Sequence, residues 1–92
     1  MKLKPNQRFC EHNGALYRLT VKPSDRYMAS VFIERYRPHK MIKWVWADTR
    51  EFWIDDYPSI EDGAKTQFYN FCCIKDQQDS IKKKWSDFEN KG

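Results

Sequence analysis

The stretch Tyr27–Ala47, with the sequence YMASVFIERYRPHKMIKWVWA, most constrains how this chain can fold. Apolar and polar residues alternate on both sides of Pro38, which predicts two strands joined by the short basic loop Arg37–Lys40. The same alternation begins earlier, at Ala15, and the sequence between it and the hairpin is rich in turn-forming residues. We therefore expect three strands, over residues 15–22, 27–36 and 41–47.

The register of these strands follows from the requirement that their apolar side chains share one face of the sheet. Pairing Pro23 with Tyr27 brings the apolar residues of the first two strands together. Pairing Tyr36 with Met41 does the same for the second and third strands. The predicted core face then consists of Tyr17, Leu19, Val21, Val31, Ile33, Ile42, Trp44 and Trp46.

The C-terminal third of the chain predicts helices. Ser59, followed by acidic residues, is typical of a helix start, and apolar residues at helical spacing continue it over residues 60–74. The run FYNFCCI at residues 68–74 contains many strand-forming residues, so a strand there is the alternative. A second, short helix is expected after a cap at Asp79 or Ser80. Its apolar face would consist of Ile81, Trp85 and Phe88.

Strands followed by helices predict an α+β fold, an antiparallel three- to four-stranded β-meander with two C-terminal helices packed on one face. The 92 residues are enough for a single domain. Within it we expect an irregular or edge segment over residues 1–14, the meander over residues 15–57 and the helical part over residues 58–90. A turn over residues 48–50 would lead into a fourth strand at residues 51–54.

Charge is distributed unevenly along the chain. Residues 1–46 contain ten basic and three acidic residues (+7), and residues 47–92 contain seven and ten (−3), which together give the net +4. This asymmetry favours an anionic partner at one face, although an even spread of both signs over a solvated surface is the alternative. No apolar run is as long as a membrane helix requires, so no membrane contact is expected. An odd number of cysteines indicates a reducing compartment, and we expect a cytoplasmic protein.

The end of the predicted hairpin is the candidate binding site. It contains the residues Arg35, Tyr36, Arg37, His39, Lys40 and Lys43, with no acidic residue among them. Clustered cations attract phosphates, and aromatic rings stack on unpaired bases. We therefore expect the site to bind a nucleic acid or a ribonucleoprotein. An ordinary solvated turn, whose charges protect the sheet edge, is the alternative.

No catalytic, metal or cofactor site is predicted, and we expect a protein that is not an enzyme and has no small-molecule substrate. The cysteines and histidines lack the spacing of a metal site. The acidic residues between Asp48 and Asp62 show no nuclease pattern, and they are more typical of a solvated loop or a docking surface for a basic partner. The three glycines are scattered and form no phosphate-binding loop.

In its size, its compactness and its absence of enzyme motifs, the chain resembles small phage-encoded host-takeover proteins, including anti-CRISPR inhibitors. Residues 35–43 are the ones that carry this resemblance. It implies a steric mechanism, in which the protein wedges into a crRNA-bearing surveillance complex in the host cytoplasm and blocks hybridisation of target DNA to the guide. Two other classes stay open: a small DNA- or RNA-binding regulator, and a protein-only adaptor or inhibitor that uses Trp53, Tyr57 and the acidic stretch.

Overall fold

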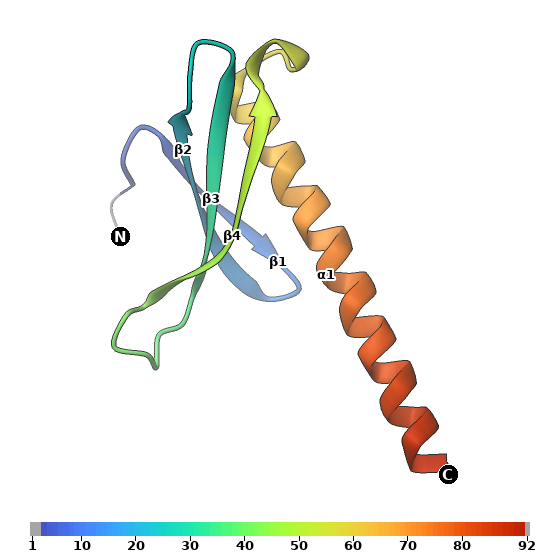
Figure 1. Cartoon of the computed structure of the whole chain (residues 1–92). Coiled ribbons are helices and arrows are strands. Elements are labelled where there is room, and N and C mark those ends of the chain that lie inside the picture. The colour runs from blue at the N-terminus through green and yellow to red at the C-terminus, as the bar shows by residue number, and fades with distance from the viewer. Residues whose placement is uncertain (1–2, 92) are drawn as a thin grey trace.

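The structure is a four-stranded antiparallel sheet with one long helix packed against it (Figure 1). The computed structural model describes the backbone of residues 3–91 and the side chains of residues 3–84. The α+β class and the meander are confirmed, because the strands lie in the sheet in chain order. The elements are β1 (Gln7–His12), β2 (Ala15–Pro23), β3 (Met28–Tyr36), β4 (Trp44–Trp53), the short 3-10 helix η1 (Ile54–Asp56) and α1 (Ile60–Lys91).

The segment that was expected to be irregular or at a sheet edge contains the edge strand β1. Asn13 and Gly14, which connect β1 to β2, have φ angles of 50° and 76°. A two-residue loop with both residues in the left-handed region matches the twist of two antiparallel strands. β1 places Arg8 on the face of the sheet that packs against the helix and Phe9 on the other face. We call these the inner and the outer face.

The turn between β2 and β3 lies where the sequence predicts it. The carboxylate of Asp25 accepts hydrogen bonds from the backbone N–H groups of Tyr27, at 2.7 Å, and Met28, at 2.9 Å. Pro23 pairs with Ala29 rather than with Tyr27, so the register differs from the predicted one by two residues. Since side chains alternate between faces, this difference leaves each of them on its predicted face. The buried residues of these two strands include Tyr17, Leu19, Val31 and Ile33, as predicted.

The predicted register between β3 and β4 is wrong. Tyr36 pairs with Trp44 instead of Met41, and a β-bulge interrupts the pairing between Ile33 and Glu34. Because the difference of three residues is odd, it moves the side chains at the start of β4 to the face opposite the predicted one. Trp44 and Trp46, predicted for the core, therefore lie on the outer face. Ile42, also predicted for the core, is exposed in the loop before β4.

β4 also replaces the two short strands and the turn that were expected between residues 41 and 54. Asp48 and Arg50, which favour a turn, lie instead on the inner face as an ion pair at 3.4 Å. The Nε of Arg50 also donates a hydrogen bond to the side-chain oxygen of Gln67 on α1, at 3.5 Å. Because these polar groups are paired with one another, a half-buried strand can contain them.

One continuous helix replaces the two that were expected, and the strand alternative for residues 68–74 is wrong. The predicted start is confirmed, because Ser59 Oγ accepts a hydrogen bond from the backbone N–H of Asp62 at 3.1 Å. The predicted cap at Asp79 or Ser80 is absent, since both lie inside α1. Residues 64–91 contain no glycine or proline, so nothing in the sequence ends the helix there. The side chains of Trp85 and Phe88 lie outside the described residues.

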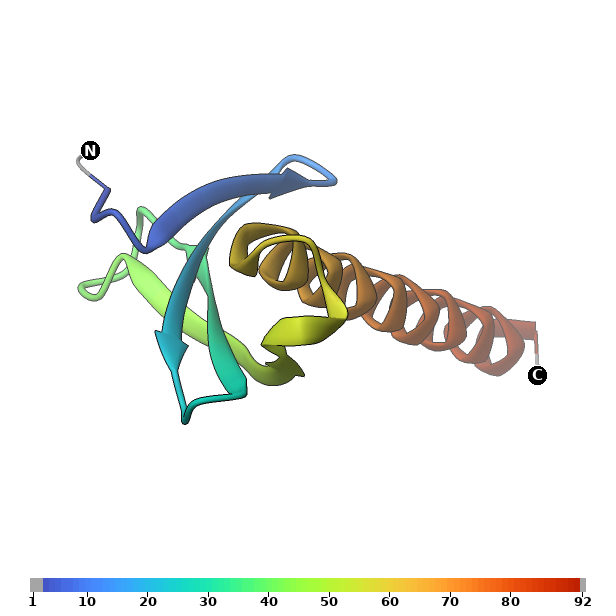
Figure 2. The same ribbon diagram turned by 90° about the horizontal axis from the view of Figure 1, so that it is seen from above.

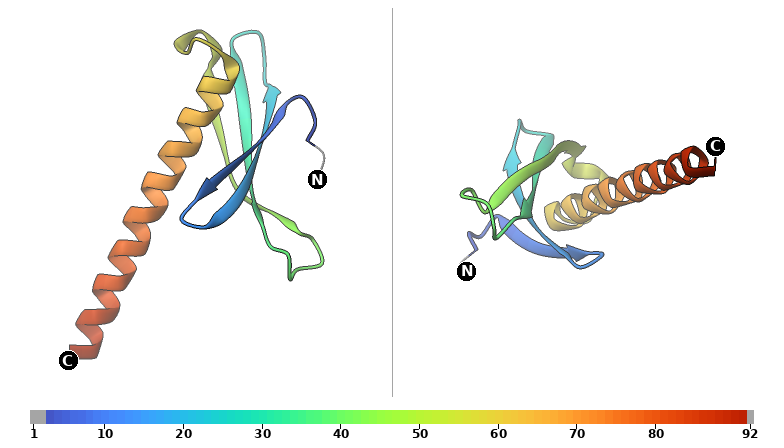
Figure 3. Two further views of the ribbon diagram at one scale, coloured as in Figure 1. Left: turned by 180° about the vertical axis from the view of Figure 1, so that it is seen from behind. Right: turned by 90° about the horizontal axis from the view of Figure 1, so that it is seen from below.

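The sheet curls around the first half of α1, and the core lies between them (Figure 2). Ala64, Phe68 and Cys72, at helical spacing, are the buried hydrophobic side chains that α1 presents to the inner face. Beyond this docked part, the helix extends away from the sheet and gives the molecule a length of 54 Å (Figure 3). No helix within the described part of the chain is long and apolar enough to cross a membrane. The outer face has no helix packed on it among residues 3–91.

Candidate nucleic-acid interface

The residues predicted as one binding site are divided among three places. Because side chains alternate along β3, Tyr36 lies on the outer face and Arg35 on the inner face. Arg37, directly after the strand, lies on the inner side with Arg35. His39, Lys40 and Lys43 lie in the loop between β3 and β4, where all three are exposed.

This loop is longer than the predicted four-residue turn. The backbone N–H of Arg37 donates a hydrogen bond to the carbonyl of Lys43 at 2.6 Å, which closes the loop at the ends of the strands. Inside it, the N–H of Lys40 bonds to the carbonyl of Arg37 at 3.1 Å. Met41 and Ile42 are exposed here, so the loop displays apolar as well as basic side chains.

Aromatic rings gather on the outer face around Trp44. The ring of Phe9 from β1 stacks on it with 5.7 Å between centroids and 12° between planes. Tyr36 lies against it at 5.0 Å, and the guanidinium carbon of Arg18 lies 4.6 Å from its centroid. Arg18 is held in turn by an ion pair with Glu34 at 2.9 Å. Trp44 is therefore fixed by contacts from three other strands.

Trp46 lies on the same face and is 63% exposed. Its indole Nε1–H donates a hydrogen bond to Thr49 Oγ1 at 2.7 Å, which restricts the orientation of the ring. A hollow of about 320 Å³ is lined by Trp46, Phe32, Lys4 and Lys22 among others. The ammonium group of Lys22 lies 5.4 Å from the centroid of Phe32. An oriented, exposed ring beside cations is suited to stacking on a base whose phosphate the cations attract.

The sequence prediction missed these outer-face residues because it assigned the tryptophans to the core. Phe9, Arg18 and Phe32 were not predicted for a site either. A signal was present in the sequence for Arg18 and Phe32, since both stand at positions that alternate with buried residues.

On the inner face, Arg35 and Arg37 line a cavity of about 390 Å³ between the sheet and the middle of α1. Arg50 of β4 and Lys75 of α1 line the same cavity. Burial raises the pKa of the Tyr17 hydroxyl, and the positive charges of Arg35 and Arg37 oppose that rise. Tyr17 lines the same cavity, and it pairs with Arg35 across β2 and β3.

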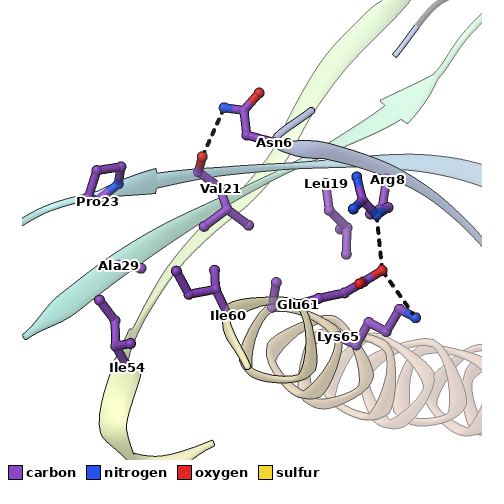
Figure 4. Close-up of a pocket in the computed structure, with 11 residues that line it drawn as sticks. Asn6, Arg8, Leu19, Val21, Pro23, Ala29, Ile54, Ile60, Glu61 and Lys65 are labelled. Carbon is purple, nitrogen blue, oxygen red and sulfur yellow. Dashed lines mark hydrogen bonds and ion pairs between the residues drawn. The ribbon is translucent and has the colours of Figure 1, made fainter. Parts of the chain in front are cut away.

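A third cavity, of about 360 Å³, lies between β1, β2 and the first turns of α1, and most of its wall is apolar (Figure 4). Glu61 accepts a hydrogen bond from Arg8 Nε at 2.9 Å and lies 3.5 Å from the ammonium group of Lys65. The hydrogen bond from Arg8 holds the pKa of Glu61 below its usual range. These groups satisfy one another, so the cavity offers an apolar space and no unpaired reactive group.

The remaining reactive side chains are dispersed. No group of three or more histidine, cysteine or acidic residues that could hold a metal ion occurs among the residues described. Cys72 is buried, and that burial raises its pKa to about 11, which disfavours the reactive thiolate. The acidic stretch from Asp48 to Asp62 does not form one loop, because it is divided among β4, η1 and the start of α1.

Comparison with known proteins identifies no family for this chain. No protein-family model matches the sequence, and no match is found among curated proteins or solved structures.

Proposed function

We propose that this protein is a non-enzymatic binding module that holds single-stranded nucleic acid on the outer face of its sheet. The observation that carries this proposal is Trp46, a tryptophan that is mostly exposed and held in one orientation by its hydrogen bond to Thr49. Exposure of so large an apolar ring to water is unfavourable, and a planar partner that covers the ring relieves it. Nucleic-acid bases are planar and stack on such rings.

The neighbours of Trp46 favour a nucleic-acid strand, rather than a single base, as the ligand. Phe32 and Tyr36 provide further aromatic surface on the same face, and Lys4 and Lys22 provide positive charge beside it. The exposed cations Lys40 and Lys43 lie in the loop that follows β3. Antiparallel sheets with aromatic rings on an open face are a common platform for unpaired RNA and DNA, whose backbone the cations attract.

The same surface would fit an unpaired strand held within a ribonucleoprotein. In that setting the protein would cover the strand and prevent its hybridisation, which is the steric inhibition that the resemblance to host-takeover proteins implies. In this version of the proposal, the protein acts sterically and catalyses no reaction. It differs from the original expectation in its surface, because the aromatic face takes the place of the basic loop as the main contact.

We expect the variant Trp46→Ala to bind single-stranded oligonucleotides about tenfold more weakly, because stacking on an aromatic side chain is worth about 1–3 kcal/mol per base. Fluorescence anisotropy with labelled, mixed-sequence DNA and RNA strands at two salt concentrations measures this. The matched control is Tyr69→Ala, which removes a similarly exposed ring from the helix and should leave the affinity unchanged. Equal losses in both variants, or no binding of either strand by the unmodified protein, would refute the proposal.

A further inference from the structure

The inner-face cavity beside β3, β4 and the middle of α1 is lined by an excess of positive charge. Arg35, Arg37, Arg50 and Lys75 line it, against a single carboxylate, that of Asp48, which gives a formal sum of +3. Two of these cations have partners, because Arg50 is paired with Asp48 and Lys75 lies 3.9 Å from Asp79. Among the described residues, neither Arg35 nor Arg37 lies within ion-pair distance of a carboxylate.

Such an arrangement is unfavourable in the empty protein. Arg35 and Arg37 are half-buried, so each has lost part of its hydration, and they repel one another and Arg50. The rest of the wall is largely apolar, with Val45 from the sheet and Phe71 and Ile74 from the helix. A bound anion would relieve the repulsion and replace the lost hydration.

We propose that this cavity binds a phosphate group attached to an organic body. Guanidinium groups match phosphate through pairs of charge-assisted hydrogen bonds, and they do so better than lysine. Arg35 and Arg37 supply these bonds, Arg50 and Lys75 add positive charge, and the apolar wall accommodates the organic part. Trp46 also lines this cavity, but it is the one residue shared with the outer-face hollow, so the phosphate site and single-strand binding can be tested separately through Arg35 and Arg37.

The phosphate has two sources with the same chemistry, a free nucleoside diphosphate and the phosphorylated 5′ end of a nucleic-acid strand. A cavity of about 390 Å³ is large enough for one nucleotide. Titration with ADP, and with matched oligonucleotides bearing a 5′-phosphate or a 5′-hydroxyl, distinguishes these sources. Saturable ADP binding supports the free nucleotide, and a preference for the 5′-phosphorylated strand supports the strand end.

The test measures affinity for inorganic pyrophosphate and ADP by isothermal titration calorimetry, with the Arg Nε–H signals followed by NMR. We expect the double variant Arg35→Gln, Arg37→Gln to lose at least about tenfold in affinity, because it removes the charge-assisted hydrogen bonds to the phosphate. The control is Lys82→Gln, Lys83→Gln, which makes the same change in charge on exposed helix residues. That control should retain the affinity of the unmodified protein.

The proposal is overturned if pyrophosphate, ADP and the 5′-phosphate all fail to shift the Arg35 and Arg37 signals, or if the lysine control loses as much affinity as the arginine variant. Circular dichroism confirms that each variant is folded. If the double variant does not fold, Arg37→Gln alone serves, because Arg37 follows the end of β3 and its backbone bond to Lys43 is unaffected. If none of these phosphate ligands binds but Trp46-dependent binding of single strands is intact, the phosphate site alone is rejected.

Discussion

Replacing Phe68 with alanine is expected to destabilise the protein by about 3–5 kcal/mol, the usual cost of truncating a buried phenylalanine. Phe68 is only 4% exposed, and its ring lies 5.3 Å from Tyr17 and 6.3 Å from Phe71. The change therefore leaves a cavity where the helix meets the sheet. A domain of this length is typically stable by about 5–14 kcal/mol, so this loss is a large share of the total. Urea denaturation followed by circular dichroism measures it.

The adjacent residue provides the control for this prediction. Tyr69 is 68% exposed, and its ring centroid lies 6.5 Å from that of Phe68. The variant Tyr69→Ala should change the free energy of unfolding by no more than about 0.5 kcal/mol, as is usual for surface positions. If the two variants are equally stable, the helix does not pack on the sheet through the face described.

The variant Gly63→Ala is expected to destabilise the protein by about 1–3 kcal/mol, the typical cost of overpacking a core. Alanine at an exposed helical position would instead stabilise it relative to glycine, by about 1 kcal/mol. The sign is reversed here because a Cβ on Gly63 would lie 2.6 Å from Cδ2 of the buried Phe52 ring. That ring is held edge-on against Tyr57 at 5.7 Å and has little room to move.

Two further variants separate steric crowding from helix propensity. Phe52→Leu combined with Gly63→Ala should cost less than the sum of the single changes, because the smaller side chain makes room for the methyl group. Asn70→Ala, at an exposed position of the same helix, should be neutral or slightly stabilising. Thermal unfolding of the unmodified protein, the two single variants Gly63→Ala and Phe52→Leu, their double variant and Asn70→Ala provides the comparison. A stabilising Gly63→Ala would show that the close approach of Phe52 is absent.

The sequence predicts most of the inner face because burial there leaves a periodic signal. Val31 and Ile33 alternate with polar residues, and the register between β2 and β3 can shift by two without changing which side chains are buried. The helix start is equally local, since Ser59 and the acids after it determine its cap. These features depend on a few neighbouring residues.

The faces of β4 could not be predicted in the same way, because they depend on a bulge and on loop length. The bulge between Ile33 and Glu34 adds one residue to one strand, and periodicity alone does not reveal it. Matching apolar residues across the strands also favoured burying Trp44 and Trp46. The prediction assumed that large aromatic residues belong to the core, whereas Trp46 is exposed and Phe52 takes the buried position.

Other errors had signals that the sequence analysis used incompletely. Asn13 followed by Gly14 is a strong two-residue hairpin signal, and it implied that β1 pairs with β2. The absence of glycine and proline from residues 64–91 favoured one long helix over two. Of the predicted site residues, Tyr36 lies on the outer face beside Trp44, and Arg35 and Arg37 line the inner-face cavity. Their separation onto two faces follows from strand alternation and was not recognised.

The most direct test of the central claim is to map where a single strand binds. We would titrate ¹⁵N-labelled protein with a 5′-hydroxyl oligonucleotide, which leaves the phosphate site on the inner face without its terminal ligand, and follow indole and backbone signals by NMR. The account predicts that the indole Nε1–H of Trp46 shifts strongly, together with the amides of Phe32 and Lys22, while those of Ala64 and Cys72 on the docked helix stay in place. Shifts confined to the inner face and helix, with Trp46 unaffected, would contradict it.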